Sequence, residues 1–238
     1  MSPRYFSSSP LKTGPLQLAG AEAHHLLHVM RAAVGDQIVL FDGVGGEFSA
    51  RIESANRKTV DCHVLAERKV DRELPHELVV GVAFPKGERR RWLVEKATEL
   101  GITRLVPVET SRSAPQPNKT SRERLRRTVI EACKQCGRNR LMEIGSRVAL
   151  AEFLLAAPTT AHRWMAHRQD GSGSAGQIDA ATGLPTWLLV GPEGGFSDSE
   201  AAQAVATGWA AVDLGPRILR VETAAVALAG LVALRPAG

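Results

Sequence analysis

The 238-residue sequence has few of the residues that mark secreted, membrane-bound or zinc-stabilised proteins. Its three cysteines, Cys62, Cys133 and Cys136, are too few for a fold held together by disulfides. A zinc site at the Cys133–Cys136 pair would need two more ligands, and only the distant Cys62 and His63 offer them. No apolar run reaches the ~18 residues of a membrane span, and the N-terminus lacks a secretory signal. We therefore expect a cytoplasmic protein with no metal and no membrane partner.

Aromatic residues and net negative charge are also scarce. Aromatics make up 5% of the chain, with a single tyrosine, which argues against a single-strand reader built on stacking platforms. The formal net charge is +5, the pI is about 9.4, and arginine outnumbers lysine by 23 to 7. Arginine binds phosphate bidentately and stacks on bases, so this bias favours folded RNA as a partner. A GC-rich genome would produce the same bias without any such function.

The common nucleotide-binding motifs are missing as well. No G-x-G-x-x-G directly follows an expected strand and opens a helix, and no G-x-x-x-x-G-K-[ST] occurs. Their absence disfavours both a Rossmann dehydrogenase and a P-loop NTPase. His24, His25 and His28 could share a helix face, but no H-E-x-x-H pattern is present, so we interpret them as ordinary helix and surface residues.

Two glycine-rich loops near the C-terminus are the most informative feature of the chain. They cover residues 191–197 (GPEGGFS) and residues 214–225 (LGPRILRVETAA). Each follows a short apolar run that predicts a buried strand, and each precedes a helix-like stretch; Ser197 with Glu200 has the capping-box pattern that starts a helix. Ligands of open α/β sheets bind at the carboxyl ends of strands, so the loops predict one small-molecule pocket. Two ordinary strand-to-helix turns would carry similar glycines.

The first third of the chain predicts β-structure. Residues 38–41 and 47–52 flank a glycine-rich turn and predict a hairpin, and residues 59–65 predict a further strand. A short helix is expected at residues 22–31. This pattern suits a small β-barrel, followed by a charged linker at residues 67–73.

From residue 78 onward the pattern alternates between strand and helix, which indicates an α/β domain. Strands are expected at residues 78–84, 105–108 and 162–166, with Pro107 favouring an edge or irregular position. Helices are expected at residues 92–100 and in a segment ending near residue 136, and the Gly/Ser-rich residues 169–176 predict a loop. Connectivity rules alone favour an unknotted doubly wound sheet, because knots are nearly absent from proteins.

Four further segments accompany the two loops: residues 42–48, 86–89, 95–101 and 131–140. With them the chain resembles the bacterial 16S ribosomal RNA uridine-N3 methyltransferases, members of the SPOUT superfamily of knotted methyltransferases. The resemblance implies a PUA-like β-barrel RNA-binding domain over residues 1–72. It also implies a SPOUT-type α/β domain with a C-terminal trefoil knot over residues 73–238. It further implies S-adenosylmethionine as methyl donor, one uridine of 16S ribosomal RNA in the small ribosomal subunit as acceptor, and a homodimer.

The resemblance also assigns site residues. The cofactor-binding set is Met165, Val190, Gly191, Pro192, Glu193, Gly194, Gly195, Leu214, Gly215, Ile218, Leu219 and Arg220. We expect Arg220 to stabilise negative charge on the uracil, and Glu193 or Glu222 to accept the N3 proton or to orient Arg220. For either carboxylate, the alternative is a helix-start residue that interacts only with the helix dipole.

Clustered basic residues predict the RNA-binding surface. The predicted contacts are Arg4, Arg31, Lys86, Arg89, Arg138, Asn139 and Arg140, whereas the arginines of residues 122–127 fit a solvated helix face. Two rival functions remain open at this point: a ribosome-assembly protein without catalysis, and a SPOUT enzyme that acts on transfer RNA or on a ribose 2′-hydroxyl.

Overall fold

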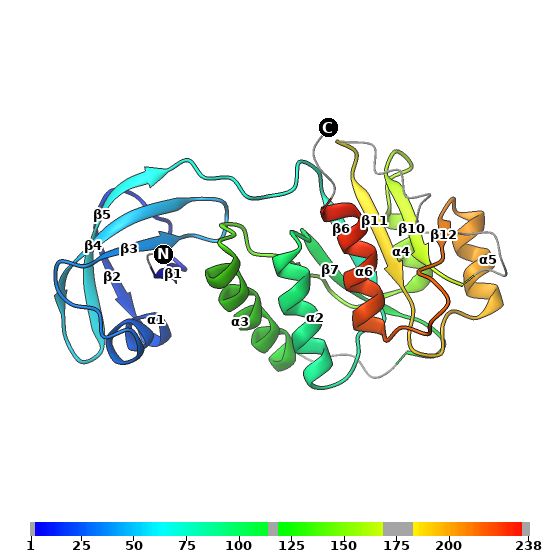
Figure 1. Ribbon diagram of the computed structural model, residues 1–238, viewed down its shortest axis with the longest axis horizontal. Coiled ribbons are helices and arrows are strands. Elements are labelled where there is room, and N and C mark those ends of the chain that lie inside the picture. The colour runs from blue at the N-terminus through cyan, green and yellow to red at the C-terminus, as the bar shows by residue number, and fades with distance from the viewer. Residues whose placement is uncertain (1–2, 114–118, 169–182, 235–238) are drawn as a thin grey trace. The chain divides into compact units, whose positions relative to one another are not determined.

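A computed structural model describes residues 3–113, 119–168 and 183–234 (Figure 1). The chain forms two compact units. The first unit contains the chain up to Glu73 together with Ile130–Leu141, and the second contains Leu74–Val129 and the chain from Met142 onward. The sequence-based division after residue 72 did not include the return of Ile130–Leu141 to the first unit. The predicted loop at residues 169–176 lies outside the described ranges.

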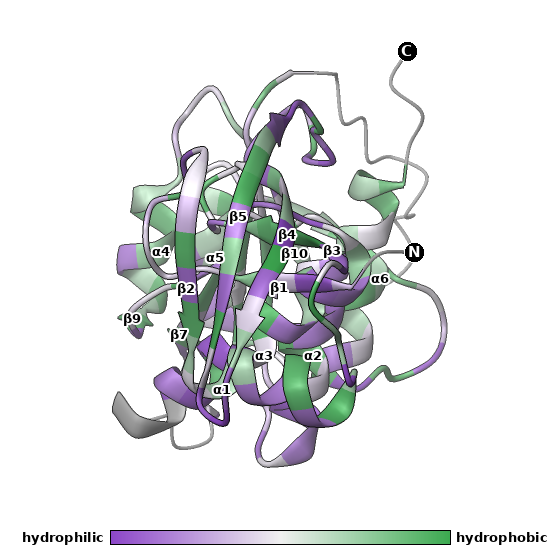
Figure 2. Cartoon of the chain, turned by 90° about the vertical axis from the view of Figure 1, so that its left-hand side faces the viewer, coloured by the Kyte–Doolittle hydropathy of each residue, from purple (hydrophilic) through white to green (hydrophobic). Residues whose placement is uncertain are grey.

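The first unit is built on a five-stranded sheet in the order β1-β3-β4-β5-β2. Its strands are β1 (Arg4–Phe6), β2 (Gly14–Ala19), β3 (Gln37–Phe41), β4 (Glu47–Ala55) and β5 (Thr59–Arg68). The predicted hairpin is confirmed by the antiparallel pairing of β3 with β4. Figure 2 shows hydrophobic and hydrophilic residues alternating along β5, as expected of a strand with one face on a core.

The predicted helix at residues 22–31 is present, but it is not a regular α-helix. The structure has a short helix α1 (Gly20–His24) that continues as a π-helix η1 (His25–Val29). The Met30 N–H donates to the carbonyl of His25, five residues earlier, which widens the turn. Arg31 then adopts a φ of 52°, in the left-handed region, and ends the helical run. Leu26 lies in this wider turn and is fully buried in the core of the first unit.

The second unit contains a seven-stranded sheet in the order β12-β10-β11-β6-β7-β8, with β9 also paired to β7. Its strands are β6 (Leu78–Val82), β7 (Arg104–Glu109), β8 (Glu143–Ile144), β9 (Val148–Ala149), β10 (His162–Ala166), β11 (Thr186–Val190) and β12 (Ala210–Val212). The pairings are parallel, and every residue of β6 and β11 is buried, as expected of strands covered on both faces. Pro107 lies in β7, opposite the gap between β8 and β9. Proline has no N–H, and at this irregular position no hydrogen bond to a neighbouring strand is lost.

In the described part of the chain from Leu74 onward, the helices are α2 (Glu88–Glu99), α3 (Lys119–Cys136, whose end belongs to the first unit), α4 (Leu150–Ala156), α5 (Asp198–Ala206) and α6 (Val221–Ala233). Helices α2 and α6 pack together on one face of the sheet (Figure 1). A separate core cluster contains residues of α4 and α5, including Phe153, whose ring lies 5.1 Å from that of Trp187. No helix within the described residues has the length and apolarity that a membrane span requires.

Candidate functional site

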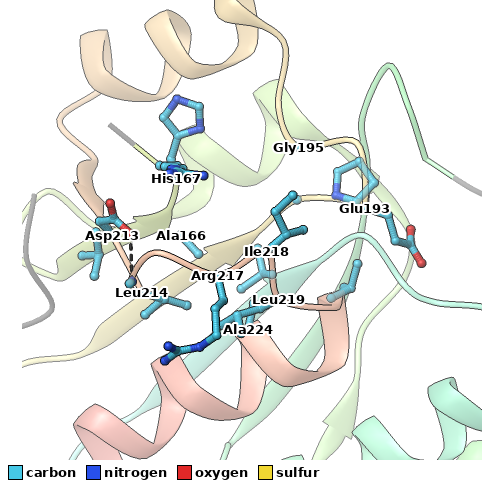
Figure 3. A pocket seen from close by; sticks show the side chains of 17 residues that line it. Ala166, His167, Glu193, Gly195, Asp213, Leu214, Arg217, Ile218, Leu219 and Ala224 are labelled. Atoms are coloured by element: carbon cyan, nitrogen blue, oxygen red, sulfur yellow. Dashed lines mark hydrogen bonds between the residues drawn. The ribbon is translucent and has the colours of Figure 1, made fainter. Parts of the chain in front are cut away.

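The two glycine-rich loops line one pocket at the carboxyl ends of the parallel strands (Figure 3). The pocket encloses a cavity of about 190 Å³ and is partly open to solvent. Nine of the predicted cofactor-binding residues lie in its wall: Val190, Gly191, Pro192, Glu193, Gly195, Leu214, Gly215, Ile218 and Leu219. The sequence therefore identified two of the walls.

The third wall was represented in the prediction only by Met165. It comes from the end of β10, and further lining residues come from β12, the second loop and α6: Ala166, His167, Arg168, Val212, Asp213, Arg217, Val221 and Ala224. The signal that could have found the third wall is the run at residues 162–166, which was recognised as a strand. The parallel order of β12, β10 and β11 places the end of β10 between the two loops, and sequence alone does not give that order.

The first loop is a tight turn that leads into α5. The Gly195 N–H donates to the Pro192 carbonyl at 2.8 Å, and Gly195 has a φ of 68° that side chains rarely tolerate. Ser197 and Glu200 form the predicted capping box. Burial alone would raise the pKa of Glu200, but hydrogen bonds from Ser111 and Ser197 outweigh it and hold the pKa below its ordinary value. The loop is thus fixed to the segment after β7.

The second loop turns at Gly215, whose φ is 102° and whose N–H donates to the Asp213 carboxylate at 2.8 Å. Ile218 is 89% exposed and points toward the first loop in Figure 3. An apolar side chain held at a pocket rim in this way offers a surface to the flat face of a ligand. Within the described residues, no group of three or more His, Cys, Asp or Glu side chains could hold a metal.

Three of the predicted cofactor-binding residues lie beside the pocket and not in its wall. Met165 is fully buried in the core, one position before the lining residue Ala166. The carbonyl of Gly194 accepts a hydrogen bond from Arg112. Arg220 is exposed and forms the N-cap position of α6.

The two predicted catalytic carboxylates lie on either side of Arg89. Its Nη1 atom is 3.0 Å from Oε1 of Glu193 and 3.9 Å from Oε2 of Glu222. The Glu222 side chain is only 8% exposed, and its Oε2 has no hydrogen-bond partner among the described residues. Arg89, predicted as an RNA contact, is therefore part of this carboxylate cluster.

In the first unit, several predicted RNA contacts are internal. Arg4 pairs with the buried Glu47 and donates to Asn139 at 2.6 Å. Arg138 is 3% exposed and forms a bidentate pair with Glu73. We therefore interpret Arg4, Arg138 and Asn139 as residues that hold Ile130–Leu141 to the rest of the first unit.

Glu47 is the centre of this internal network. Arg68 and Arg72 also reach its carboxylate, at 3.2 and 3.1 Å. Burial would raise the pKa of Glu47, but the hydrogen bonds and charges of Arg4 and Arg72 outweigh it and lower the pKa below its ordinary value. Three guanidinium groups around one carboxylate leave an excess of positive charge.

That excess borders a polar cavity of about 300 Å³ in the first unit. Arg68, Arg72 and Arg140 line it together with Lys69, and their charges outnumber those of the acidic residues Glu67, Asp71 and Glu73. Arg140 is exposed, as are Arg31 elsewhere in this unit and Lys86 in the second unit. Arg68 and Arg72 were not among the predicted RNA contacts, because they belong to the run at residues 67–73, which was interpreted as a linker.

The Cys133–Cys136 pair lies in α3, away from the end of any strand. Burial raises the pKa of the Cys133 thiol to about 12, so the thiolate needed for metal binding or redox chemistry is disfavoured. The Cys133 thiol donates to the Arg140 carbonyl at 3.5 Å. This position, inside a helix and with Cys133 buried, indicates a structural role for the pair.

Comparison with known proteins places both parts of the chain. Residues 72–233 match the model of the RNA methyltransferase domain family, and residues 18–65 match the RNA methyltransferase PUA domain. Ribosomal RNA small subunit methyltransferase E of Bacillus subtilis (strain 168) is 30% identical over 237 residues, which cover 93% of this chain and 92% of that protein.

Two solved structures are similar along nearly their whole length. A methyltransferase from Legionella pneumophila in complex with the bound cofactor SAM has a TM-score of 0.89 at 30% identity, covering 98% of this chain and 97% of that chain. Ribosomal RNA small subunit methyltransferase E from Neisseria gonorrhoeae, bound to S-adenosyl methionine, has a TM-score of 0.87 at 30% identity, with the same coverage. The chain therefore belongs to the ribosomal RNA small subunit methyltransferase E family, with a PUA-like N-terminal domain and an α/β RNA methyltransferase domain.

Proposed function

We propose that this chain transfers a methyl group from S-adenosylmethionine to N3 of one uridine in 16S ribosomal RNA. The observation that carries the proposal is the pocket in which two glycine-rich loops and the end of β10 meet at the carboxyl edge of a parallel sheet. Relatives with this fold are named as ribosomal RNA small subunit methyltransferases, and similar structures hold the same cofactor.

The pocket residues fit such a cofactor. Val190, Leu214 and Leu219 supply apolar surface for an adenine, and the backbone of the two loops supplies polar groups for the ring edge and ribose. An added Cβ at Gly215 would meet no atom within 4 Å, so the space beside this backbone is open to a ligand. When bound, S-adenosylmethionine supplies an electrophilic methyl group on its sulfonium.

The remaining task of the protein is to align the acceptor and to remove the N3 proton. We assign Arg220 to the uracil oxygens, where its charge would stabilise the negative charge that develops as N3 is deprotonated. Glu222 and Glu193 are the candidate proton acceptors near this edge. The low exposure of Glu222 favours it for chemistry that excludes water.

The RNA is held, in this proposal, by the exposed cations of both units. Arg140, with Arg68 and Arg72 at the cavity of the first unit, supplies charge for backbone phosphates, as do Arg31 and Lys86. Arg4, Arg138 and Asn139 support this surface from inside.

Three further features belong to the proposal. The knot is supported by the path of the chain after β12, because the second loop returns to the pocket and α6 packs against β6 and β11. A homodimer is supported by exposed apolar side chains such as Trp92 and Ile218. The assembled small ribosomal subunit, in the cytoplasm, is the proposed setting, since low aromatic content suits folded RNA better than single strands.

The experiment is methyl transfer from labelled S-adenosylmethionine to small ribosomal subunits that lack the modification, to free 16S RNA and to transfer RNA. Label in 16S RNA, free or in subunits, is the expected result. Label in transfer RNA alone would keep the reaction type and overturn the substrate. RNA binding without cofactor binding or transfer would instead favour an assembly protein.

A further inference from the structure

The first glycine-rich loop is held from outside the pocket by two arginines. Arg112, which follows β7, donates from Nη1 to the Gly194 carbonyl at 2.6 Å. Arg89, in the first turn of α2, donates from Nη1 to Glu193 at 3.0 Å. Neither arginine is part of the pocket wall, so each acts on the loop from a neighbouring element.

Arg89 also connects this loop to the helix that follows the second loop. Its Nη1 lies 3.9 Å from Oε2 of Glu222, on the first turn of α6. A buried carboxylate without a nearby cation or a hydrogen bond is costly, and Oε2 of Glu222 has no hydrogen bond within the described chain. A single guanidinium therefore lies between two carboxylates, one from each glycine-rich segment.

The pairing of Arg89 argues against a phosphate at this position. Its charge is already offset by the carboxylates of Glu193 and Glu222, so it adds little attraction for the RNA backbone. Arg89 would also have to leave both carboxylates before it could bind a phosphate bidentately.

We infer that Arg89 and Arg112 are positioning residues that fix the first loop for cofactor binding, and that Arg89 does not contact RNA. The inference rests on the proposed function, since it takes S-adenosylmethionine as the ligand of this pocket. Arg89 joins the two segments through Glu193 and Glu222, and Arg112 holds the carbonyl side of the turn at Gly194. Arg89 acts through these two carboxylates and Arg112 through the backbone of the loop.

The test is calorimetric titration of S-adenosylmethionine and S-adenosylhomocysteine into Arg89→Gln, Arg112→Gln and the matched control Arg91→Gln. Arg91 is an exposed residue of the same helix, and its change removes the same charge. We expect Kd to rise about three- to tenfold for Arg89→Gln and Arg112→Gln, the size of a coupling between contacting groups, and to stay unchanged for Arg91→Gln. Arg89→Lys should recover only part of the affinity, because an ammonium group lacks the planar fork that spans two carboxylates.

Two readouts separate positioning from a general loss of structure or of RNA contact. The Tm of Arg112→Gln should match that of Arg91→Gln, because its lost hydrogen bond is exposed, whereas Arg89→Gln should lower Tm, because the buried Glu222 loses its nearby cation. The slope of RNA affinity against salt should equal that of the wild type. An unchanged cofactor Kd, or a salt slope smaller by about 1, would overturn the inference. If the wild-type protein binds no S-adenosylmethionine, the proposed function fails together with the inference. If the wild-type protein transfers the methyl group normally and the cofactor Kd of both variants is unchanged, only the inference fails.

Discussion

At the scale of single residues, the charged side chains divide into those that face solvent and those that face one another. Arg220 is exposed at the start of α6, beside the pocket and outside its wall. If it stabilises charge on the uracil, its removal should affect the transfer step and leave the cofactor in place. We expect Arg220→Ala to lower kcat by roughly 100-fold, the effect of losing one charge-stabilising donor, with less than about a threefold change in cofactor affinity.

Single-turnover kinetics and calorimetry on the same preparation check this prediction. Arg57→Ala, in the β4–β5 turn of the first unit, is the control. Unchanged turnover in Arg220→Ala would remove this residue from the proposed mechanism and direct attention to Arg217, which lies in the pocket wall.

Glu47 provides a second prediction at this scale, because its lowered pKa couples folding to pH. Above the ordinary value of 4.5 the carboxylate is ionised whether the chain is folded or not, and its pairs with the arginines contribute in full. As pH falls below that value, the unfolded chain binds the proton first, so stability is lost until the folded carboxyl also titrates. Glu47→Gln should destabilise the first unit at neutral pH by about 3 kcal/mol, the low end for breaking a buried pair, and should flatten the loss in acid.

Hydrogen exchange of β3 and β4, followed as a function of pH, reports on the first unit alone. If the amides of β3 and β4 lose protection from exchange equally in the wild-type and Glu47→Gln proteins as pH falls toward 3, Glu47 does not couple folding to pH.

At the scale of elements, the missing side chain of Gly81 in β6 sets how closely α4 packs on the sheet of the second unit. Gly81 in β6 faces Phe153 of α4, and an added Cβ would lie 2.4 Å from its ring. The ring also contacts Trp187 and Trp209, so it has little room to move. We expect Gly81→Ala to cost about 1–3 kcal/mol, as overpacking does.

Gly230→Ala is the matched control, because a Cβ there meets only Leu234 at 3.9 Å. That helical position should gain about 0.5–1 kcal/mol. All four tryptophans lie in the second unit, so their fluorescence during denaturant unfolding measures both changes. Equal stability of Gly81→Ala and wild type would contradict the packing described for α4.

Individual loops, strands and helices differ in how well the sequence predicts them. Glycines in the two loops and the Ser197–Glu200 capping box are local signals, and they located two walls of the pocket and the start of α5. The third wall depends on strand order, which is a property of the whole sheet. The π-helical turn at residues 25–29 was not predicted either. No residue type is typical of such a turn, and Leu26 within it is buried in the core, which is a property of the folded unit.

Charged residues were harder to assign than glycines, for a physical reason. An arginine that binds phosphate and one that pairs with a buried carboxylate have the same side chain, and only the partner distinguishes them. Arg138 and Arg140 are two residues apart, yet Arg138 is buried against Glu73 and Arg140 is exposed at a cavity.

At the scale of the whole molecule, this difference predicts how the protein binds RNA. Arg140→Gln should reduce the slope of log affinity against log salt by about 0.9, the effect of losing one phosphate contact. Arg138→Gln should leave the slope unchanged and lower Tm, because Glu73 loses its bidentate partner. Filter binding to 16S RNA at several salt concentrations, with thermal unfolding in parallel, measures both; the reverse pattern would mean that Arg138 leaves Glu73 to bind RNA.

The atom that receives the methyl group is N3 of a uridine in the proposed reaction, and nucleoside mass spectrometry identifies it. Small ribosomal subunits lacking the modification are incubated with the protein and labelled S-adenosylmethionine, and the RNA is digested to nucleosides. We expect labelled N3-methyluridine in the 16S RNA, and none when the cofactor or the protein is omitted. A label found only on a ribose 2′-oxygen or on another base would rule out N3 of uridine as the acceptor.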